Sequence, residues 1–153
     1  LRDLPSFPTR RSSDLLGGIL IPSGKGCVAH SDGDVLIHAI CDALLGAAGL
    51  NDIGYYFPDS SSEFKGIDSK ILLKRTFRLI NEKGYTINNL DCTVCLENPK
   101  IAPFIQEMRK TVAEILCTSP ENVTIKATTT EKMGFTGREE GIIVMAVALI
   151  SGS

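Results

Sequence analysis

Hydrophobic and polar positions along this chain follow two periods, and the changes between them mark helices and strands in a mixed order. Apolar residues at helical spacing predict amphipathic helices over residues 34–50, 69–83 and 102–116. Alternating or continuous apolar runs predict strands over residues 16–21, 85–96, 123–130 and 141–150. Because helices and strands do not alternate regularly, we expect an α+β two-layer sandwich, with a mixed β-sheet carrying helices on one face.

The last predicted strand is apolar on both of its faces, since every residue from Ile142 to Ile150 is hydrophobic. A strand covered on one face only would carry polar residues on the other. We therefore expect the second face of the sheet to pack against copies of the same chain in a symmetric oligomer. The run has about half the length of a membrane-spanning helix, so no membrane partner is expected.

The first fifteen residues, LRDLPSFPTRRSSDL, follow neither period. We expect residues 1–15 to be a non-native or disordered segment. Residues 16–153 are then expected to form a single domain whose N-terminal strand is incomplete.

Composition places the chain among ordinary globular proteins, because 43% of its residues are hydrophobic and 22% are charged. Its net charge of -2 provides no positive field for a phosphate backbone, so nucleic acid is not an expected partner. Five cysteines, an odd number at irregular spacing, favour free thiols in a reducing compartment. Cys92 and Cys95 form a C-x-x-C, but their odd separation in a strand points them to opposite faces.

A dense polar cluster, HSDGDVLIH, contains both histidines of the chain, His30 and His38. Imidazoles and carboxylates on a rigid helix start are suitable ligands for zinc. The same residues also fit a helix-capping cluster with a solvated histidine, and spacing alone does not separate the two interpretations.

Two polar loops are further candidates for chemistry. Residues 51–66 carry Asp52 and Asp59, which can bind sugar hydroxyls or a metal, although ordinary turns use the same residues. Residues 128–138 carry a threonine run, Glu131 and Arg138, which offer hydroxyls, backbone amides and charge to phosphate and a carboxylate to magnesium. A threonine run is also common in plain strands.

Three segments together resemble a known family. They are AHSDGDVLIHAICDALLGAAGLNDIGYYFPD, the element from Lys65 to Ser69, and KATTTEKMGFTGREEG. They closely resemble the 2-C-methyl-D-erythritol 2,4-cyclodiphosphate synthases of non-mevalonate isoprenoid (terpenoid) biosynthesis, over about Leu16 to Ile150. The resemblance implies a metal-dependent phosphorus-oxygen lyase. Its substrate, 4-diphosphocytidyl-2-C-methyl-D-erythritol 2-phosphate, attacks its own β-phosphorus through the 2-phosphate and expels CMP.

The resemblance also implies the site residues. His30 and Thr129 would be catalytic through phosphate contacts, with Ser31 assisting His30. The implied contacts to ribose and methylerythritol are Asp52, Ile53, Gly54, Phe57, Pro58, Asp59, Ser60 and Ser61. The implied cradle for cytosine is Leu96, Glu97, Asn98, Pro99, Lys100, Ile101 and Ala102. The implied phosphate or further substrate contacts are Thr128, Thr130, Glu131, Phe135 and Arg138.

Two divalent metals are implied by the resemblance. Magnesium or manganese would be held by Glu131 and the diphosphate. Zinc would be held by His38 and an Asp-x-His pair near the N-terminus, but that pair falls on Leu4 and Ser6, which are not zinc ligands. Asp3 or Asp14 would be the substitutes, and a foreign N-terminus is the explanation we favour.

Family members are homotrimers with active sites between subunits, so the resemblance implies the same assembly here. It also implies the bacterial cytoplasm or the plastid stroma as the compartment. Two alternatives use the same residues. One is a catalytically impaired trimer that binds a cytidine nucleotide or an isoprenoid phosphate, and the other is a metal-dependent phosphohydrolase.

Overall fold

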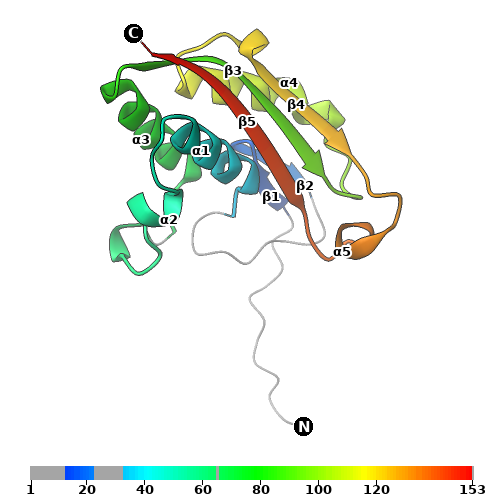
Figure 1. Cartoon of the computed structure of the whole chain (residues 1–153). Helices are drawn as coiled ribbons and strands as arrows, with labels where there is room; N and C mark the ends of the chain where they lie inside the picture. Colours follow the sequence, from blue (N-terminus) through cyan, green and yellow to red (C-terminus); the bar gives the residue numbers. More distant parts are fainter. Residues whose placement is uncertain (1–12, 23–32, 65, 153) are drawn as a thin grey trace.

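A three-stranded sheet and a layer of three helices form the body of the chain in the computed structural model, which describes residues 13–22, 33–64 and 66–152 (Figure 1). The strand order is β4-β3-β5. The central strand β3 (Tyr85–Cys95) pairs in parallel with β4 (Val123–Thr128) and antiparallel with β5 (Ile143–Gly152). The helices are α1 (Val35–Ala47), α3 (Ser69–Glu82) and α4 (Ile105–Ile115). The expected α+β sandwich with a mixed sheet is confirmed.

The core lies between these two layers. On the inner face of β3, Leu90, Cys92 and Val94 are fully buried, as their alternation predicts. Helix α3 buries Leu72, Leu73, Thr76 and Ile80, the face that helical spacing predicts. For α1, helical spacing predicts an apolar side of Val35, Leu36, Ala39, Ile40, Ala43 and Leu44. The helix is turned from that orientation, and its buried residues are Leu36, Ile37, Ile40, Cys41, Leu44 and Leu45. This helix is apolar over more than one stripe, so periodicity alone does not fix which side faces the core.

A β-hairpin precedes α1, and it corrects the prediction of one strand over residues 16–21. Strand β1 (Ser13–Leu16) pairs antiparallel with β2 (Ile19–Pro22). The turn consists of Gly17 and Gly18 at φ 60° and 77°, a left-handed conformation that glycine adopts without strain. Adjacent glycines therefore mark the turn rather than the interior of a strand. The first strand also begins at Ser13, inside the segment of residues 1–15 that the sequence left without structure.

The polar segments contain short helices that periodicity does not predict. Residues 51–66 include α2 (Ile53–Tyr56) and the 3-10 turn η1 (Ser62–Phe64). The segment before α4 begins with the 3-10 turn η2 (Ala102–Phe104), and η3 (Pro120–Asn122) leads into β4. The loop after β4 includes α5 (Gly134–Gly137). Strand β4 ends at Thr128, two residues earlier than expected, because the next residues turn away from the sheet.

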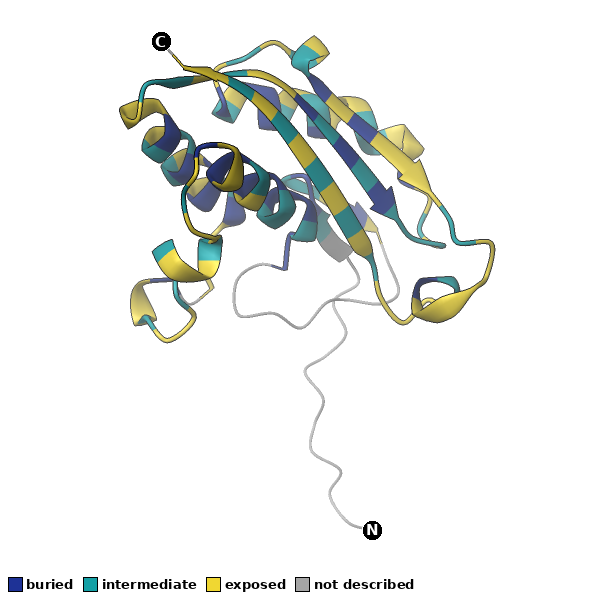
Figure 2. Cartoon of the chain, viewed as in Figure 1, coloured by how far each residue is buried: buried dark blue, intermediate teal, exposed yellow. Residues whose placement is uncertain are grey.

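The face of the sheet that the helices do not cover is apolar along β5. Met145, Val147 and Leu149 are 57%, 69% and 59% exposed, while the residues between them are half-buried. Figure 2 shows this alternation along the strand. On β3 and β4 the same sheet carries an ion pair, Lys126 Nζ to Asp91 Oδ1 at 3.0 Å. Within the described ranges, no helix is long and apolar enough to cross a membrane.

Candidate active site

The parallel pairing of β3 with β4 brings together two segments that lie about thirty residues apart in the sequence. Their last paired residues are Cys95 and Thr128. One step further, Leu96 N donates to Thr128 O at 3.0 Å. The expected cytosine cradle, residues 96–102, therefore begins beside the expected phosphate and metal segment, residues 128–131. Parallel strands end at the same edge of a sheet, which is why this juxtaposition follows from the topology.

The turn after β4 is held by side chains as well as by its own backbone. Glu97 Oε1 accepts hydrogen bonds from Thr130 N at 3.1 Å and from Lys132 N at 3.2 Å. Thr129 Oγ1 accepts Glu131 N at 3.3 Å. Three of the backbone amides that the sequence offers to phosphate, those of residues 130–132, are therefore used inside the protein. Of the side chains in this turn, Glu131 is exposed and Thr129 is half-buried.

The Thr130 hydroxyl is engaged within the same loop. Its Oγ1 donates to Met133 O at 2.7 Å and lies 2.8 Å from Thr136 Oγ1. Thr136, on α5, is buried, although Phe135 before it is exposed. The sequence groups Thr136 with the loop hydroxyls offered to phosphate, but its burial and its contact with Thr130 give it an internal role instead. Thr130 remains a predicted substrate contact, but its hydroxyl has an internal structural role.

Arg138 lies exposed at the end of α5 and forms a bidentate ion pair with Glu140. Arg138 Nε donates to Oε1 at 2.9 Å, and Nη2 donates to Oε2 at 3.3 Å. Glu140 raises the pKa of the Arg138 guanidinium through these hydrogen bonds and through its charge. Phe135 is exposed in the same loop, and the Asn98 amide donates to the Glu139 carboxylate. The loop therefore gathers Glu131, Phe135 and Arg138 on exposed positions next to the 96–102 segment.

The expected ribose contacts form a second group on α2. Asp52 caps this helix, and its Oδ1 accepts Tyr55 N at 2.9 Å. Asp42 Oδ1 on α1 accepts Ile53 N at 2.9 Å, which fixes α2 to α1. Helical spacing puts Asp42 on the same polar side of α1 as His38, and it does not indicate this hydrogen bond to α2. After Phe57, residues 58–61 close a turn in which Ser61 N donates to Pro58 O at 3.1 Å.

His38 lies on α1, half-buried, with its Nε2 3.0 Å from the hydroxyl of Ser69. Ser69 is fully buried in the first turn of α3, while Asp68 caps that helix by accepting Lys70 N at 2.9 Å. A hydrogen bond at one ring nitrogen orients the imidazole and favours metal binding at the other. The position of His38 in the sequence gave no indication of its bond to Ser69.

The candidate zinc positions near the N-terminus and the expected phosphate contacts in the HSDGD segment lie outside the residues whose side chains the structure describes. His30, Ser31, Leu4, Ser6 and Asp3 lie outside them, and for Asp14 only the backbone is described. Within the described ranges, no three His, Cys, Asp or Glu side chains cluster as a metal site. The expected zinc site is therefore represented by His38 alone in this part of the chain.

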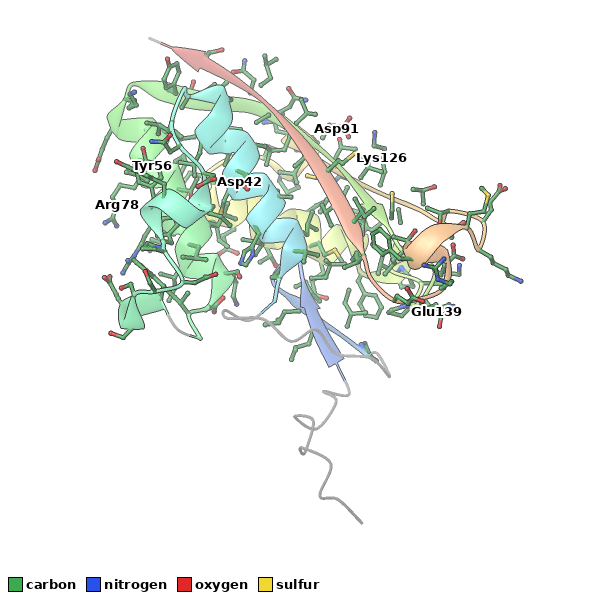
Figure 3. All side chains as sticks on the ribbon, turned by 60° about the horizontal axis from the view of Figure 1, so that its bottom comes forward. Asp42, Tyr56, Arg78, Asp91, Lys126 and Glu139 are labelled. Atoms are coloured by element: carbon green, nitrogen blue, oxygen red, sulfur yellow. The ribbon has the colours of Figure 1, made fainter. Side chains whose placement is uncertain are left out.

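The two groups of expected site residues lie on opposite sides of one chain. In Figure 1, α2 and α5 are at opposite ends of the molecule. After the rotation in Figure 3, Asp42 and Tyr56 beside α2 are still far from Glu139 next to α5. A single chain thus carries the residues expected to contact ribose at one side. The residues expected to contact cytosine, the phosphates and the magnesium or manganese ion lie at the other.

The described cysteines do not form a redox pair. Cys92 is buried and Cys95 is half-buried on the other parity of β3, as their spacing predicts. Burial raises the pKa of the Cys92 thiol to about 12, and burial also raises the pKa of Cys41 to about 12. Because the thiolate is the reactive form, both buried thiols are unreactive at neutral pH.

Comparison with known proteins identifies the family. The YgbB family model matches residues 6–151, nearly the whole chain. The chain belongs to the YgbB family. The match begins within residues 1–15 and covers every segment that carries the sequence resemblance, which is thereby confirmed.

Individual relatives of this YgbB-family chain carry the same enzyme name. It is 58% identical over 136 residues to the 2-C-methyl-D-erythritol 2,4-cyclodiphosphate synthase of Bacteroides fragilis, covering 89% of this chain and 86% of the relative. It is 58% identical over 135 residues to the synthase of Azotobacter vinelandii, covering 88% and 86%.

Solved structures agree with these relatives. The fold matches the bifunctional IspDF of Campylobacter jejuni with a TM-score of 0.90 and 41% identity, covering 94% of this chain and 39% of that longer chain. It matches the CDP complex of IspF from Plasmodium falciparum with a TM-score of 0.81 and 33% identity, covering 92% and 85%.

Proposed function

We propose that this YgbB-family chain converts 4-diphosphocytidyl-2-C-methyl-D-erythritol 2-phosphate to 2-C-methyl-D-erythritol 2,4-cyclodiphosphate and CMP. The observation that carries the proposal is the junction at the ends of β3 and β4, where Leu96 N donates to Thr128 O. That junction unites the segment expected to hold cytosine with the turn expected to hold the diphosphate. Relatives of this name are 58% identical to the chain, which supports the same reaction.

The reaction needs no protein nucleophile. An oxygen of the substrate's 2-phosphate forms a bond to the β-phosphorus, and the bond from that phosphorus to the CMP oxygen breaks. CMP leaves with the electron pair, and water is not consumed. The protein must therefore fold the substrate so that the attacking oxygen and the leaving group are in line, and must stabilise the charge on the transferring phosphoryl group. The Thr129 hydroxyl and the Arg138 guanidinium are placed on the loop that would do this.

Glu131 is the residue that fits the second metal. Its carboxylate is exposed and supplies hard oxygen ligands, which magnesium and manganese prefer. A divalent ion held there with diphosphate oxygens would neutralise charge on the phosphates. His38 is the zinc ligand that we assign within the described residues, with Ser69 orienting its ring.

The cytosine cradle is the segment from Leu96 to Ala102. Backbone groups there would recognise the edge of the base, which explains why its composition does not look catalytic. Ile101 is buried and anchors the segment, while Lys100 Nζ donates to Glu97 O at 3.1 Å. The compartment that we assign is the bacterial cytoplasm or the plastid stroma.

The active enzyme is a homotrimer with each site between two neighbouring chains. The expected ribose contacts on α2 and the expected phosphate contacts beyond β4 lie at opposite sides of one chain, which supports a site formed where two chains meet. The exposed apolar residues of β5, Met145, Val147 and Leu149, supply a surface for that assembly.

The direct test is CMP release from the diphosphocytidyl substrate with zinc and magnesium supplied, with the phosphorus products identified by ³¹P NMR. Cyclic diphosphate supports the proposal. A linear diphosphate would indicate attack by water and a phosphohydrolase instead. Binding of CDP with no turnover would indicate the impaired trimer.

Mixing of inactive variants tests the shared site. Asp52→Ala damages one group and Glu131→Ala the other, and each variant alone is expected to be inactive. When the two are co-expressed, about a quarter of the sites between chains receive an intact Asp52 from one chain and an intact Glu131 from its neighbour. About a quarter of wild-type activity is therefore expected to return. A site built within one chain would recover no activity on mixing.

A further inference from the structure

We propose that the side chain of Glu97 is a positioning residue, which holds the turn of residues 129–132 in the conformation that presents Glu131. Glu97 lies in the segment assigned to cytosine, where backbone groups do the binding. Its carboxylate points instead to the turn after β4 and accepts two backbone amides there. The inference rests on the proposed function for its effect on activity, but not for its effect on the turn.

The turn has a conformation that requires stabilisation from outside. Glu131 and Lys132 both have positive φ, 52° and 64°. Residues with a Cβ rarely adopt this left-handed conformation, and two in succession are costly. Such strain persists only where surrounding contacts determine the geometry. The turn's own backbone supplies one such contact, Met133 N to Thr130 O at 3.0 Å.

Glu97 supplies the contacts that this backbone lacks. Thr130 N and Lys132 N, on either side of Glu131, both point at the same oxygen, Glu97 Oε1. Alternate amides that converge on one point form a concave site for an anionic atom. In this protein the anionic atom comes from the chain itself. The amide between them, Glu131 N, donates to Thr129 Oγ1, so the amides of residues 130–132 all have acceptors within the protein.

The backbone of Glu97 is fixed by its neighbours, so its side chain can hold the turn in place. Leu96 N is bonded to Thr128 O, and the Asn98 side chain donates to Glu139 at the far end of the same loop. Glu97 itself is half-buried between these two anchors. The cytosine segment and the Glu131 turn are therefore joined by hydrogen bonds, and those of Glu97 lie on either side of Glu131.

Three variants separate positioning from general stability. Glu97→Ala removes the acceptor. Glu97→Gln keeps an acceptor oxygen on a side chain of the same length, so it is expected to keep most of the stability of the turn. Glu114→Ala is the matched control, because Glu114 is an exposed glutamate on α4, away from this loop.

Amide hydrogen exchange measures the turn without reference to activity. In Glu97→Ala the amides of Thr130 and Lys132 are expected to exchange about tenfold or more faster than in the wild type, while amides of β3 are unchanged. Glu97→Gln is expected to stay within about threefold of the wild type, and Glu114→Ala to match it. Equal exchange of these two amides in the wild type and Glu97→Ala would overturn the proposal.

Manganese dependence of CMP release measures the effect on Glu131. Glu97→Ala is expected to raise the half-saturating Mn²⁺ concentration about tenfold and to lower kcat, with Glu97→Gln restoring both. A lower kcat at unchanged half-saturating Mn²⁺ would mean fewer folded molecules and would overturn the positioning role. If the wild type itself releases no CMP, the proposed function fails, and hydrogen exchange still decides the role of Glu97.

Discussion

The buried carboxylate of Asp34 accepts the backbone N–H of Gly17 at 3.0 Å, across seventeen positions of sequence. Its second oxygen accepts Gly18 N at 2.7 Å, and Oδ1 also accepts Ile37 N at 3.0 Å in the first turn of α1. One side chain therefore caps α1 and holds the tight turn of the hairpin. A buried carboxylate is costly unless such donors surround it, so this group fixes the position of the hairpin on the helix layer.

Asp34→Ala is expected to lower the free energy of unfolding by about 3 kcal/mol, because it removes the cap and leaves the Gly17 and Gly18 amides without their acceptor. Asp34→Asn keeps one acceptor oxygen and is expected to lose less. Urea unfolding followed by circular dichroism measures both. Asp59→Ala, at an exposed turn position, is the control, and an Asp34→Ala variant as stable as this control would contradict the assignment.

Glu131→Ala is expected to lower kcat for CMP release about a hundredfold or more, because the carboxylate assigned to the second metal is lost. Cys92→Ser is the comparison, since Cys92 is fully buried in β3 and is not one of the site residues that we assign. Placing a hydroxyl there is expected to lower stability while kcat per folded molecule stays near the wild-type value. Similar activities for the two variants at saturating magnesium would refute the role of Glu131.

Val147→Lys tests the exposed face of β5. Val147 is 69% exposed in the single chain, and a charge there would be buried when chains assemble. We expect sedimentation to show single chains in place of trimers, and CMP release to be lost because the two groups no longer meet. Ile71→Lys, on α3, is the control that keeps the assembly. A Val147→Lys variant that stays trimeric would place the interface elsewhere.

Periodicity predicts the elements of this fold whose apolar face is unambiguous. Helix α3 and the inner face of β3 bury the residues that their spacing indicates. It fails where backbone conformation decides, as at Gly17 and Gly18, whose positive φ turns an expected strand into a hairpin. It also fails at α2 and α5, since helices of one turn are too short to show a period.

In the candidate site too, the sequence indicates some features and not others. The residue types that the sequence selects, such as Asp52 and Glu131, are those that can bind sugar or metal. Their supporting contacts depend on pairings between distant segments, such as Asp42 with Ile53 and His38 with Ser69. No local pattern encodes those pairings, so the sequence does not reveal them.

Arg138 and Glu140 offer a test of how the loop binds phosphate. Arg138→Ala is expected to lower kcat/KM about tenfold, because one guanidinium contact is lost. Glu140→Gln is expected to lower KM, because in the wild type the Glu140 carboxylate competes with the substrate for Nε and Nη2 of Arg138. Both side chains of the pair are exposed, so neither change is expected to alter the urea midpoint. Unchanged kinetics in both variants would remove Arg138 from the site.

Buried and exposed thiols of this protein are expected to react at different rates, because burial changes the pKa of the thiol. Burial disfavours the charged thiolate, and it raises the pKa of Cys92 from 9.0 to about 12. At pH 8 the thiolate fraction is then about a thousandfold lower than for an ordinary cysteine. We expect Ellman's reagent to modify the exposed Cys117 quickly, and to modify Cys41 and Cys92 only in urea. Mass spectrometry of the labelled peptides identifies each site.

The same shift predicts how stability depends on pH. Below pH 9.0 the Cys92 thiol is protonated in both the folded and the unfolded chain, so its full contribution to stability is present. As pH rises from 9.0 toward about 12, the unfolded chain ionises and the folded chain does not, so the free energy of unfolding falls. Cys92→Ala is expected to weaken this fall between pH 9 and pH 11, measured by urea unfolding. An unchanged slope would mean that the Cys92 thiol ionises as readily in the folded chain as in the unfolded one.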